Sequence, residues 1–289
     1  MRILVLAVAL VLVTSGLSAA QPSETVTLGF RNLPFSLEPH VLELNASLVN
    51  GNIFDKLVQR SVRGDLEPAL ATSWKSVSDT VLEFKLRHDV KFHNGDALTP
   101  DDVKYSFERA LDSAKKLTSG GQLHGIKTVQ IVDADTVRVI TEKPFPALIG
   151  LLAGLAIVPG KYVEKVGDQA FAAAPIGTGP WRFVEWKRDQ YIRLEAFDQH
   201  WRGKPPFRHL VVRSLPDVST RMAELKTGGL TSCGGRPSIS SRSSSGSRTC
   251  TSARCRARAC ITSRSTCACR RSTISSSGRQ RTTPSTSRR

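Results

Sequence analysis

This 289-residue sequence contains no Gly-X-Y period, no sustained heptad and no internal run of 18 apolar residues. These absences exclude a collagen, a coiled coil and a polytopic membrane protein. The sequence also lacks the Gly-x-Ser-x-Gly, His-Glu-x-x-His and phosphate-cradling motifs that mark common catalytic sites. Catalysis has no constellation of residues to rest on, so we expect a non-enzymatic protein without a cofactor.

Negative charge is absent from one end of the chain. Residues 230–289 contain 13 Arg but no Lys, Asp or Glu, and all six cysteines lie between positions 233 and 269. The whole chain has 41 basic and 25 acidic residues, but the first 229 residues have 28 basic against 25 acidic, a difference of only +3. The net charge of the whole chain would suggest a basic nucleic-acid binder, but it combines two segments of very different composition.

Residues 1–20 have the pattern of a secretory signal peptide. Met1 and Arg2 supply a positive end, Ile3 to Val13 is an unbroken apolar run, and the segment ends in Ser18-Ala19-Ala20. A membrane anchor is the alternative, but a helix needs about 20 apolar residues to cross a bilayer. No cysteine near the cleavage point offers a lipid attachment site. We expect cleavage after Ala20 and a periplasmic protein.

The segment between residues 21 and 229 has the pattern of a globular mixture of strands and helices. Period-2 alternation predicts strands at 25–30, 82–87, 128–132, 136–140, 181–186, 191–196 and 209–214. Thr99 can cap a helix whose first residue is Pro100, and Asp217 to Thr227 reads as a helix that Gly228 ends. Strands with interspersed helices indicate an α/β fold of the mixed α+β kind.

Several ordered motifs resemble one known family. Residues 66–74 read Leu-Glu-Pro-Ala-Leu-Ala-Thr-Ser-Trp, residues 82–87 read Leu-Glu-Phe-Lys-Leu-Arg, and residues 90–103 read Val-Lys-Phe-His-Asn-Gly-Asp-Ala-Leu-Thr-Pro-Asp-Asp-Val. Two later landmarks follow in the expected order, Pro-Ile-Gly-Thr-Gly-Pro-Trp at 175–181 and Asp-Gln-His-Trp-Arg-Gly at 198–203. From about Val26 to Gly229 the chain resembles the family 5 extracellular solute-binding proteins of ABC importers, the dipeptide, oligopeptide and nickel receptors.

The resemblance implies a type II periplasmic-binding-protein fold with two lobes and a subdomain inserted in the first. Residues 21–45 and 172–229 would form part of the first lobe, and residues 46–171 the inserted subdomain. The second lobe should follow Gly229 and is missing, so we expect this chain alone to be unable to close around a solute. Family partners would be the permease subunits of an importer in the inner membrane, and the receptor would act as a monomer without a specific nucleic-acid partner.

Two features inside this region invite a choice between packing and ligand binding. Gly177-Thr178-Gly179-Pro180 lets the backbone run close to a neighbouring strand or to a ligand, and we favour packing. His88 and His93 with Asp89 and Asp96 suggest a metal site, but a third ligand at helical spacing is lacking. A solvated hairpin turned by Asn94-Gly95 is the better interpretation, so we expect no metal.

Residues 230–289 do not resemble a folded domain. Ser, Thr and Arg occupy 39 of these 60 positions, and past Leu230 the only large apolar residues are Ile239, Ile261 and Ile274. Such a composition cannot offset a chain entropy of about 1–2 kcal/mol per ordered residue. A basic disordered arm would bind polyanions through charge, which is the alternative function for this protein. The cysteines lack paired zinc-knuckle spacing, so a metal or disulfide segment is the weaker possibility.

A shifted reading frame is the third explanation of this tail. Read one base upstream, the codons after Gly229 allow Ala-Asp-Ile-Val-Trp-Gly, which resembles the family's next segment, a helix end followed by a strand. Most Cys and Ser codons then become codons for large apolar residues. We therefore interpret residues 230–289 as disordered and out of frame.

Candidate ligand residues lie after the first predicted strand. The strand ends near Phe30 and is followed by Asn32 and Phe35, at the kind of edge where open α/β sheets place ligand crevices. Phe35 offers an apolar wall, and Asn32 a donor and an acceptor for a peptide amide. Gln122, in a glycine-flanked loop, would reach the same cleft from the inserted subdomain. The sequence thus predicts a receptor that captures peptides or similar small solutes for import.

Overall fold

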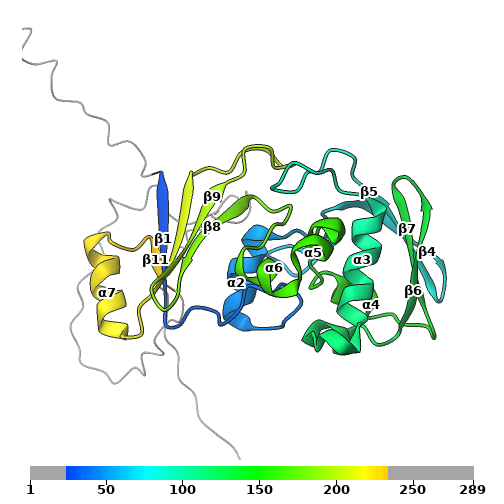
Figure 1. Ribbon diagram of the computed structural model, residues 1–289, viewed down its shortest axis with the longest axis horizontal. Helices are drawn as coiled ribbons and strands as arrows, with labels where there is room; N and C mark the ends of the chain where they lie inside the picture. The colour runs from blue at the N-terminus through cyan, green and yellow to red at the C-terminus, as the bar shows by residue number, and fades with distance from the viewer. Residues whose placement is uncertain (1–23, 234–289) are drawn as a thin grey trace, which may run out of the picture. The chain divides into compact units, whose positions relative to one another are not determined.

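The computed structural model describes residues 24–233 (Figure 1). The expected signal peptide and residues 234–289 lie outside the described residues. A five-stranded sheet contains β1 (Thr25–Phe30), β8 (Trp181–Lys187), β9 (Tyr191–Ala196), β10 (His209–Ser214) and β11 (Ser232–Cys233), in the order β11-β1-β10-β9-β8. Strand β1 runs parallel to both neighbours, with Val26 opposite Leu210 and Leu28 opposite Ser232. Strands β8, β9 and β10 are antiparallel.

A four-stranded antiparallel sheet is built entirely from the middle of the chain. It contains β4 (Ala71–Ser78), β5 (Val81–Leu86), β6 (Ile126–Asp133) and β7 (Thr136–Thr141), in the order β4-β5-β7-β6. The strands predicted at 128–132 and 136–140 are confirmed, because β6 and β7 pair antiparallel on either side of Asp133–Asp135. A separate two-stranded pair is formed by β2 (Val58–Arg60) and β3 (Leu66–Pro68).

Six α-helices and two short 3₁₀ helices accompany the sheets in the described residues. The α-helices are α2 (Leu44–Ile53), α3 (Pro100–Leu111), α4 (Leu148–Leu152), α5 (Gly160–Val166), α6 (Asp168–Ala173) and α7 (Val218–Thr227). The 3₁₀ helices are η1 (Ser113–Lys115) and η2 (Thr118–Gln122). The described elements give a mixed α/β fold.

Helix α3 forms where the sequence predicts it because both its cap and its apolar stripe are present. Thr99 accepts a hydrogen bond from the Asp102 amide, and Asp102 accepts one from the Thr99 amide at 2.9 Å, which completes a capping box. Val103, Phe107 and Ala110 are buried in one core with the four-stranded sheet. Burying each of the larger two stabilises the fold by about 1.5–3 kcal/mol.

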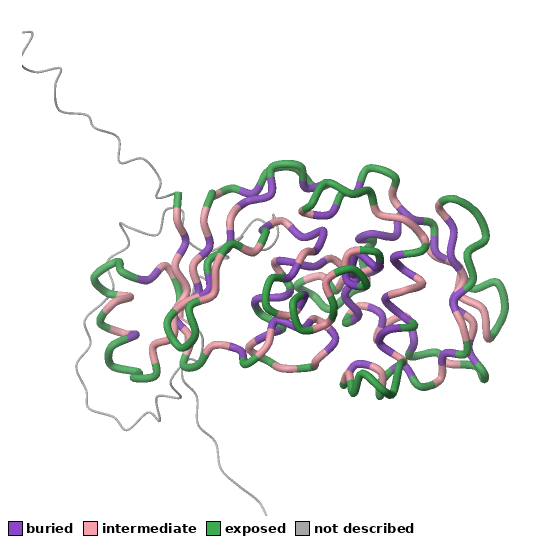
Figure 2. The backbone as a smooth tube through the Cα atoms, in the orientation of Figure 1, coloured by how far each residue is buried: buried purple, intermediate pink, exposed green. Residues whose placement is uncertain are grey.

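Helix α7 also confirms its predicted ends. The Asp217 carboxylate accepts a hydrogen bond from the Thr220 amide at 2.6 Å. At the other end Gly228 has φ +85°, the left-handed conformation that glycine adopts without a steric cost. Figure 2 shows that most of this helix is exposed or half-buried, and Arg221 is its one buried residue.

Two hydrophobic cores lie beside the two sheets. One contains Phe84, Phe107 and Val137 and joins the four-stranded sheet to α3 and α4. The other contains Phe54, Phe171 and Ile192 and joins the five-stranded sheet to α2, α5 and α6. Buried positions follow both sheets along the backbone in Figure 2.

The prediction that the chain is disordered from residue 230 is wrong for residues 230–233. Leu230 is 2% exposed, and it packs so closely on Gly29 that a Cβ there would lie 2.6 Å from Leu230 Cδ1. Thr231 donates its amide to the Thr27 carbonyl at 2.8 Å, and Ser232–Cys233 continue as β11. Strand β1 supplies the backbone hydrogen-bonding groups that make this short strand possible. The amino-acid composition of residues 230–289 contains no information about these backbone partners.

Candidate functional site

The carboxyl edge of the five-stranded sheet brings together three chain segments. Strands β1, β10 and β11 are parallel, so the backbone leaves all three at the same edge. Leu215 donates its amide to the Phe30 carbonyl at 2.7 Å, and Ser214 donates to Gln190 in the β8–β9 turn at 2.8 Å. Because open sheets with parallel strands place ligand crevices at this edge, it is the first place to look for a binding site.

The loop that follows β1 is held by two side chains from other elements. Arg188 Nη1 donates to the Phe35 carbonyl at 2.8 Å, and the Phe35 amide donates to Glu43 Oε2 at 3.3 Å. Arg188 itself stacks on the Trp186 ring, with its Cζ 3.6 Å from the ring centroid. Burial raises the pKa of Glu43, and the amide hydrogen bonds that it accepts oppose this change. Both peptide groups of Phe35 are thus occupied.

Asn32 and Phe35 keep their side chains available on this loop. The Phe35 side chain is 66% exposed although its backbone is fixed. Asn32 is exposed, and within residues 24–233 its amide group has no hydrogen-bond partner. The exposed amide and the exposed ring are therefore both accessible on a backbone that is held in place.

Gln122 lies on η2, an element separate from this loop. Helix η2 contacts the far end of this loop, because the Ser119 amide donates to the His40 carbonyl at 3.0 Å and Thr118 Oγ1 accepts from the Leu42 amide at 2.6 Å. Gln122 is exposed, and no hydrogen bond joins it to Asn32 or Phe35 in the described part of the chain. The gathering of all three residues around one cleft stays a prediction.

A buried ionic network fixes the far end of the same loop. Arg109 on α3 makes two hydrogen bonds to Glu38, at 2.7 and 2.8 Å, and another to Asp168 at 2.8 Å. The Arg109 side chain is 1% exposed and the Glu38 side chain 8%. Burial alone would lower the pKa of Arg109, but its contacts with Glu38 and Asp168 raise it. A paired, hydrogen-bonded charge of this kind is costly to break.

His40 completes the network as a neutral side chain. Because Arg109 Nη1 can only donate, His40 Nδ1 accepts its hydrogen bond at 3.0 Å. Nε2–H then donates to the Ala156 carbonyl at 2.9 Å. Burial lowers the pKa of His40 from 6.5 to about 4. No sequence motif indicates this network, since Arg109 lies 71 residues from Glu38 and 59 from Asp168.

His93 is not the solvated hairpin residue that the sequence suggests. Its Nε2 hydrogen-bonds the Gly179 carbonyl at 2.9 Å, its Nδ1 accepts from the Gly177 amide at 3.3 Å, and its ring meets Phe197 edge-on at 5.0 Å. Burial lowers its pKa to about 4. His88 instead pairs with Asp135 at 2.9 Å. Residues 24–233 contain no group of three or more His, Cys, Asp or Glu side chains placed to hold a metal.

The glycines at 177 and 179 permit packing, but against a helix end rather than a strand. A Cβ on Gly177 would lie 2.1 Å from the Ile53 carbonyl oxygen, and one on Gly179 would lie 2.5 Å from that of Asn52. The Gly179 amide donates to Ile53 at 2.8 Å, which satisfies a carbonyl at the end of α2. The choice of packing is therefore confirmed, and its predicted partner, a strand, is corrected.

Comparison with known proteins decides the family. Residues 65–245 match the bacterial extracellular solute-binding proteins, family 5 Middle. The chain belongs to this family. The match continues past Gly229, where we expected the resemblance to end. Its last residues, 234–245, lie outside the part of the chain that the structure describes.

Individual family 5 proteins show the same relationship. The chain is 34% identical over 203 residues to heme-binding protein A of Haemophilus influenzae, covering 61% of this chain and 37% of that protein. It is 33% identical to di/tripeptide-binding protein 2 of Pseudomonas aeruginosa, covering 55% of this chain and 34% of that protein. The crystal structure of NikZ from Campylobacter jejuni in complex with Ni(L-His) superposes with a TM-score of 0.68 and 29% identity, covering 73% of this chain and 43% of that one.

These similarities confirm the predicted family and the periplasmic-binding-protein fold. Family 5 proteins are binding receptors rather than enzymes. The chain spans well under half the length of the family 5 relatives that it matches. Among residues 24–233, no helix has the length and apolar character needed to cross a bilayer.

Proposed function

We propose that this chain carries part of the solute receptor of an ABC importer, which captures peptides or similar small solutes in the periplasm. The observation that carries the proposal is the family 5 match over residues 65–245. The signal-peptide pattern of residues 1–20 would export the protein, which would then act as a monomer that delivers its solute to permease subunits in the inner membrane.

Peptides are the preferred solute class because of the chemistry at the carboxyl edge of the five-stranded sheet. A free amide at Asn32 can donate to and accept from a peptide group, and the exposed Phe35 ring can cover an apolar side chain. One relative is named for di- and tripeptides, which supports this choice, whereas others are named for heme and nickel. We place Asn32, Phe35 and Gln122 at the solute.

The same proposal limits what residues 1–289 can do alone. A two-lobed receptor retains its solute by closing one lobe on the other. The matched part of this chain corresponds to 43% of the NikZ chain, and we propose that the second lobe is not among residues 1–289. We therefore expect these residues alone to bind peptides with a Kd above about 1 mM, compared with micromolar binding by a complete receptor.

Calorimetry tests the proposal once the gene has been resequenced across the codons for Gly228 to Cys233. If a base is missing or added there, the protein with the restored reading frame should be titrated with trialanine, hemin and the nickel–histidine complex. Micromolar binding of trialanine alone supports the peptide assignment. Binding of only hemin or the nickel complex contradicts the peptide assignment and keeps the receptor, whereas binding of none contradicts both.

The Arg-rich tail supplies the alternative function, and the same preparations test it. A protein that works through 13 Arg would bind single-stranded DNA with an affinity that falls steeply with salt. We expect residues 1–289 to show that salt-dependent binding without sequence preference, and the restored protein to show none. Binding by residues 1–289 that does not fall with salt, or DNA binding that persists in the restored protein without this tail, would contradict a function of the Arg-rich tail.

A further inference from the structure

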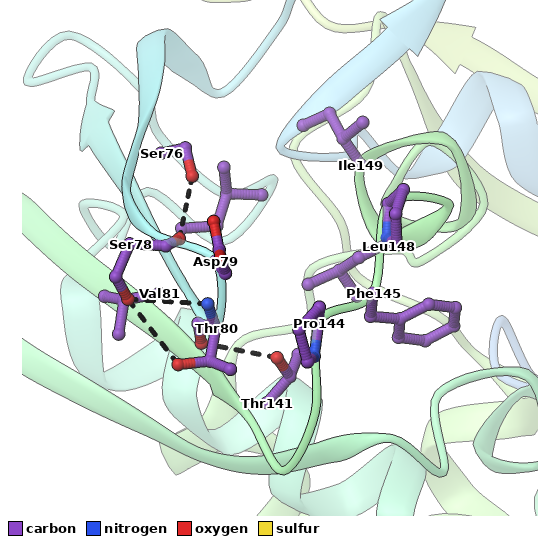
Figure 3. Close-up of a pocket in the computed structure, with 12 residues that line it drawn as sticks. Ser76, Ser78, Asp79, Thr80, Val81, Thr141, Pro144, Phe145, Leu148 and Ile149 are labelled. Carbon is purple, nitrogen blue, oxygen red and sulfur yellow. Dashed lines mark hydrogen bonds between the residues drawn. The ribbon is translucent and has the colours of Figure 1, made fainter.

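A pocket of about 320 Å³ lies at one end of the four-stranded sheet (Figure 3). One wall is the turn between β4 and β5, including Ser78, Asp79 and Thr80. The facing wall is the segment after β7, including Pro144 and Ile149. Asn32, Phe35 and Gln122 do not line it, so the two sites share no residue.

The hydroxyl groups of this pocket are already bonded within the protein. Ser76 Oγ donates to the Ser78 carbonyl at 2.8 Å, and Ser78 Oγ accepts from the Thr80 amide at 3.4 Å. Thr141 Oγ1 hydrogen-bonds the Thr80 carbonyl at 3.3 Å (Figure 3). It also lies 2.8 Å from the Lys143 carbonyl. These bonds hold the turn against the segment after β7, which makes the pocket a built feature.

Asp79 differs from these hydroxyls because its carboxylate is free. It is the one charged residue lining the pocket, it is exposed, and within residues 24–233 it has no ion pair and no hydrogen-bond partner. A negative charge beside an open pocket favours a cationic ligand.

The apolar part of the pocket is aliphatic. Pro144 and Ile149 stand opposite the turn, whereas the Phe145 ring points away from the pocket (Figure 3). That ring packs on Gly125, where a Cβ would lie 3.1 Å from Phe145 Cδ1. An aliphatic wall suits a short alkyl chain, and the volume lies at the small end of ligand pockets, which are about 300–1,000 Å³.

We propose that this pocket binds small aliphatic monocations, with the ammonium or guanidinium group at Asp79 and the alkyl chain against Pro144 and Ile149. Asp79 is solvated, so a single ion pair contributes little and the affinity is millimolar. The ligand class is smaller than the peptides proposed for the solute site, and the pocket does not require a second lobe.

Backbone amide NMR of the 289-residue chain tests the proposal, with n-butylammonium chloride as the probe from 0 to 50 mM. Saturable shifts of amides in residues 78–82 and 141–149 are expected, with at least fivefold weaker shifts for 1-butanol and for sodium butyrate. Asp79→Asn should weaken butylammonium binding at least fivefold, because it removes the charge and keeps a residue suited to a turn.

Asp89→Asn is the matched control, since Asp89 is an exposed and unpaired aspartate on the same part of the chain. It should leave the affinity within twofold of the unchanged protein. Absence of saturable shifts at these amides, equal binding of butyrate, or equal losses from the two substitutions would each overturn the assignment.

Discussion

His93 and Gly177 bond to each other through the backbone and through the imidazole. The His93 amide donates to the Gly177 carbonyl at 2.9 Å, and the Gly177 amide donates to His93 Nδ1 at 3.3 Å. Because Nδ1 accepts, Nε2 carries the proton and donates to Gly179. This pair attaches the segment after β5 to the chain that re-enters the five-stranded sheet, so protonating Nδ1 removes one of its bonds.

Acid should destabilise the fold before its carboxylates titrate. Burial lowers the pKa of both His93 and His40 from 6.5 to about 4. The unfolded chain therefore takes up protons near pH 6.5 that the folded chain refuses, so the contribution to stability is present above pH 6.5. It is lost as pH falls toward 4, by roughly 3 kcal/mol for each histidine.

Urea unfolding of the 289-residue chain at pH 7.5, 6, 5 and 4.5 measures the slope of the free energy of unfolding against pH. His93→Gln should flatten it by about half, because one of the two groups is removed. Gln130→Ala, at an exposed glutamine that does not titrate, should leave the pH dependence unchanged. A free energy of unfolding that stays constant between pH 7.5 and 4.5 would contradict the assignment of buried neutral histidines.

Gly179→Ala should destabilise the protein by about 1–3 kcal/mol. The added Cβ would lie 2.5 Å from the Asn52 carbonyl oxygen and 2.6 Å from the Ile53 carbonyl carbon, and these backbone atoms cannot move independently. Gly121→Ala is the matched control, since a Cβ there meets nothing within 4 Å. Its free energy of unfolding should stay within about 0.5 kcal/mol of the unchanged protein. Equal changes in the free energy of unfolding for the two substitutions would show that Gly179 does not pack tightly against the end of α2.

Arg109→Met should cost about 3–5 kcal/mol, because it leaves the Glu38 carboxylate buried without its partner. Arg138→Met removes a partner of Glu83 at a site where the arginine is 37% exposed, so its effect should stay below about 1 kcal/mol. Chemical denaturation of the two variants gives the comparison. If Arg109→Met lowers the free energy of unfolding no more than Arg138→Met does, the Arg109 network does not stabilise the loop between β1 and α2.

Export should leave Gln21 as the first residue of the mature protein. Residues 1–20 combine a positive end, an apolar run and a small-residue terminus, which is what signal peptidase recognises. Intact-mass analysis of the protein recovered from the periplasm identifies the new terminus. Recovery with Met1 retained would contradict a cleavable signal and favour the membrane-anchor alternative.

Elements with local signals could be predicted, and elements made by distant contacts could not. The sequence shows the cap of α3 at Thr99 and the end of α7 at Gly228, because both depend on neighbouring residues. Strand β4 was missed because most of its residues are exposed and polar, and pairing with β5 makes it a strand. The sequence does not predict helix α2, because its own apolar residues are spread around the helix instead of recurring on one face with a helical period.

The candidate site shows the same division. The position of Asn32 and Phe35 after β1 followed from alternation along one strand. One of the side chains that hold their loop, Arg188, lies 153 residues from Phe35 in the turn between β8 and β9. No spacing rule within a single sequence connects such partners.

The central claim is that the loop after β1 contacts a peptide, and one calorimetric comparison tests it most directly. The protein with the restored reading frame should be titrated with trialanine as the unchanged chain and as Asn32→Ala, Phe35→Ala and Gln122→Ala. Gln130→Ala, at an exposed glutamine on β6, is the control and should bind within twofold of the unchanged protein. We predict that Asn32→Ala and Phe35→Ala each weaken binding about tenfold, or roughly 1.4 kcal/mol. Unchanged affinity in both would contradict the account and place the peptide elsewhere.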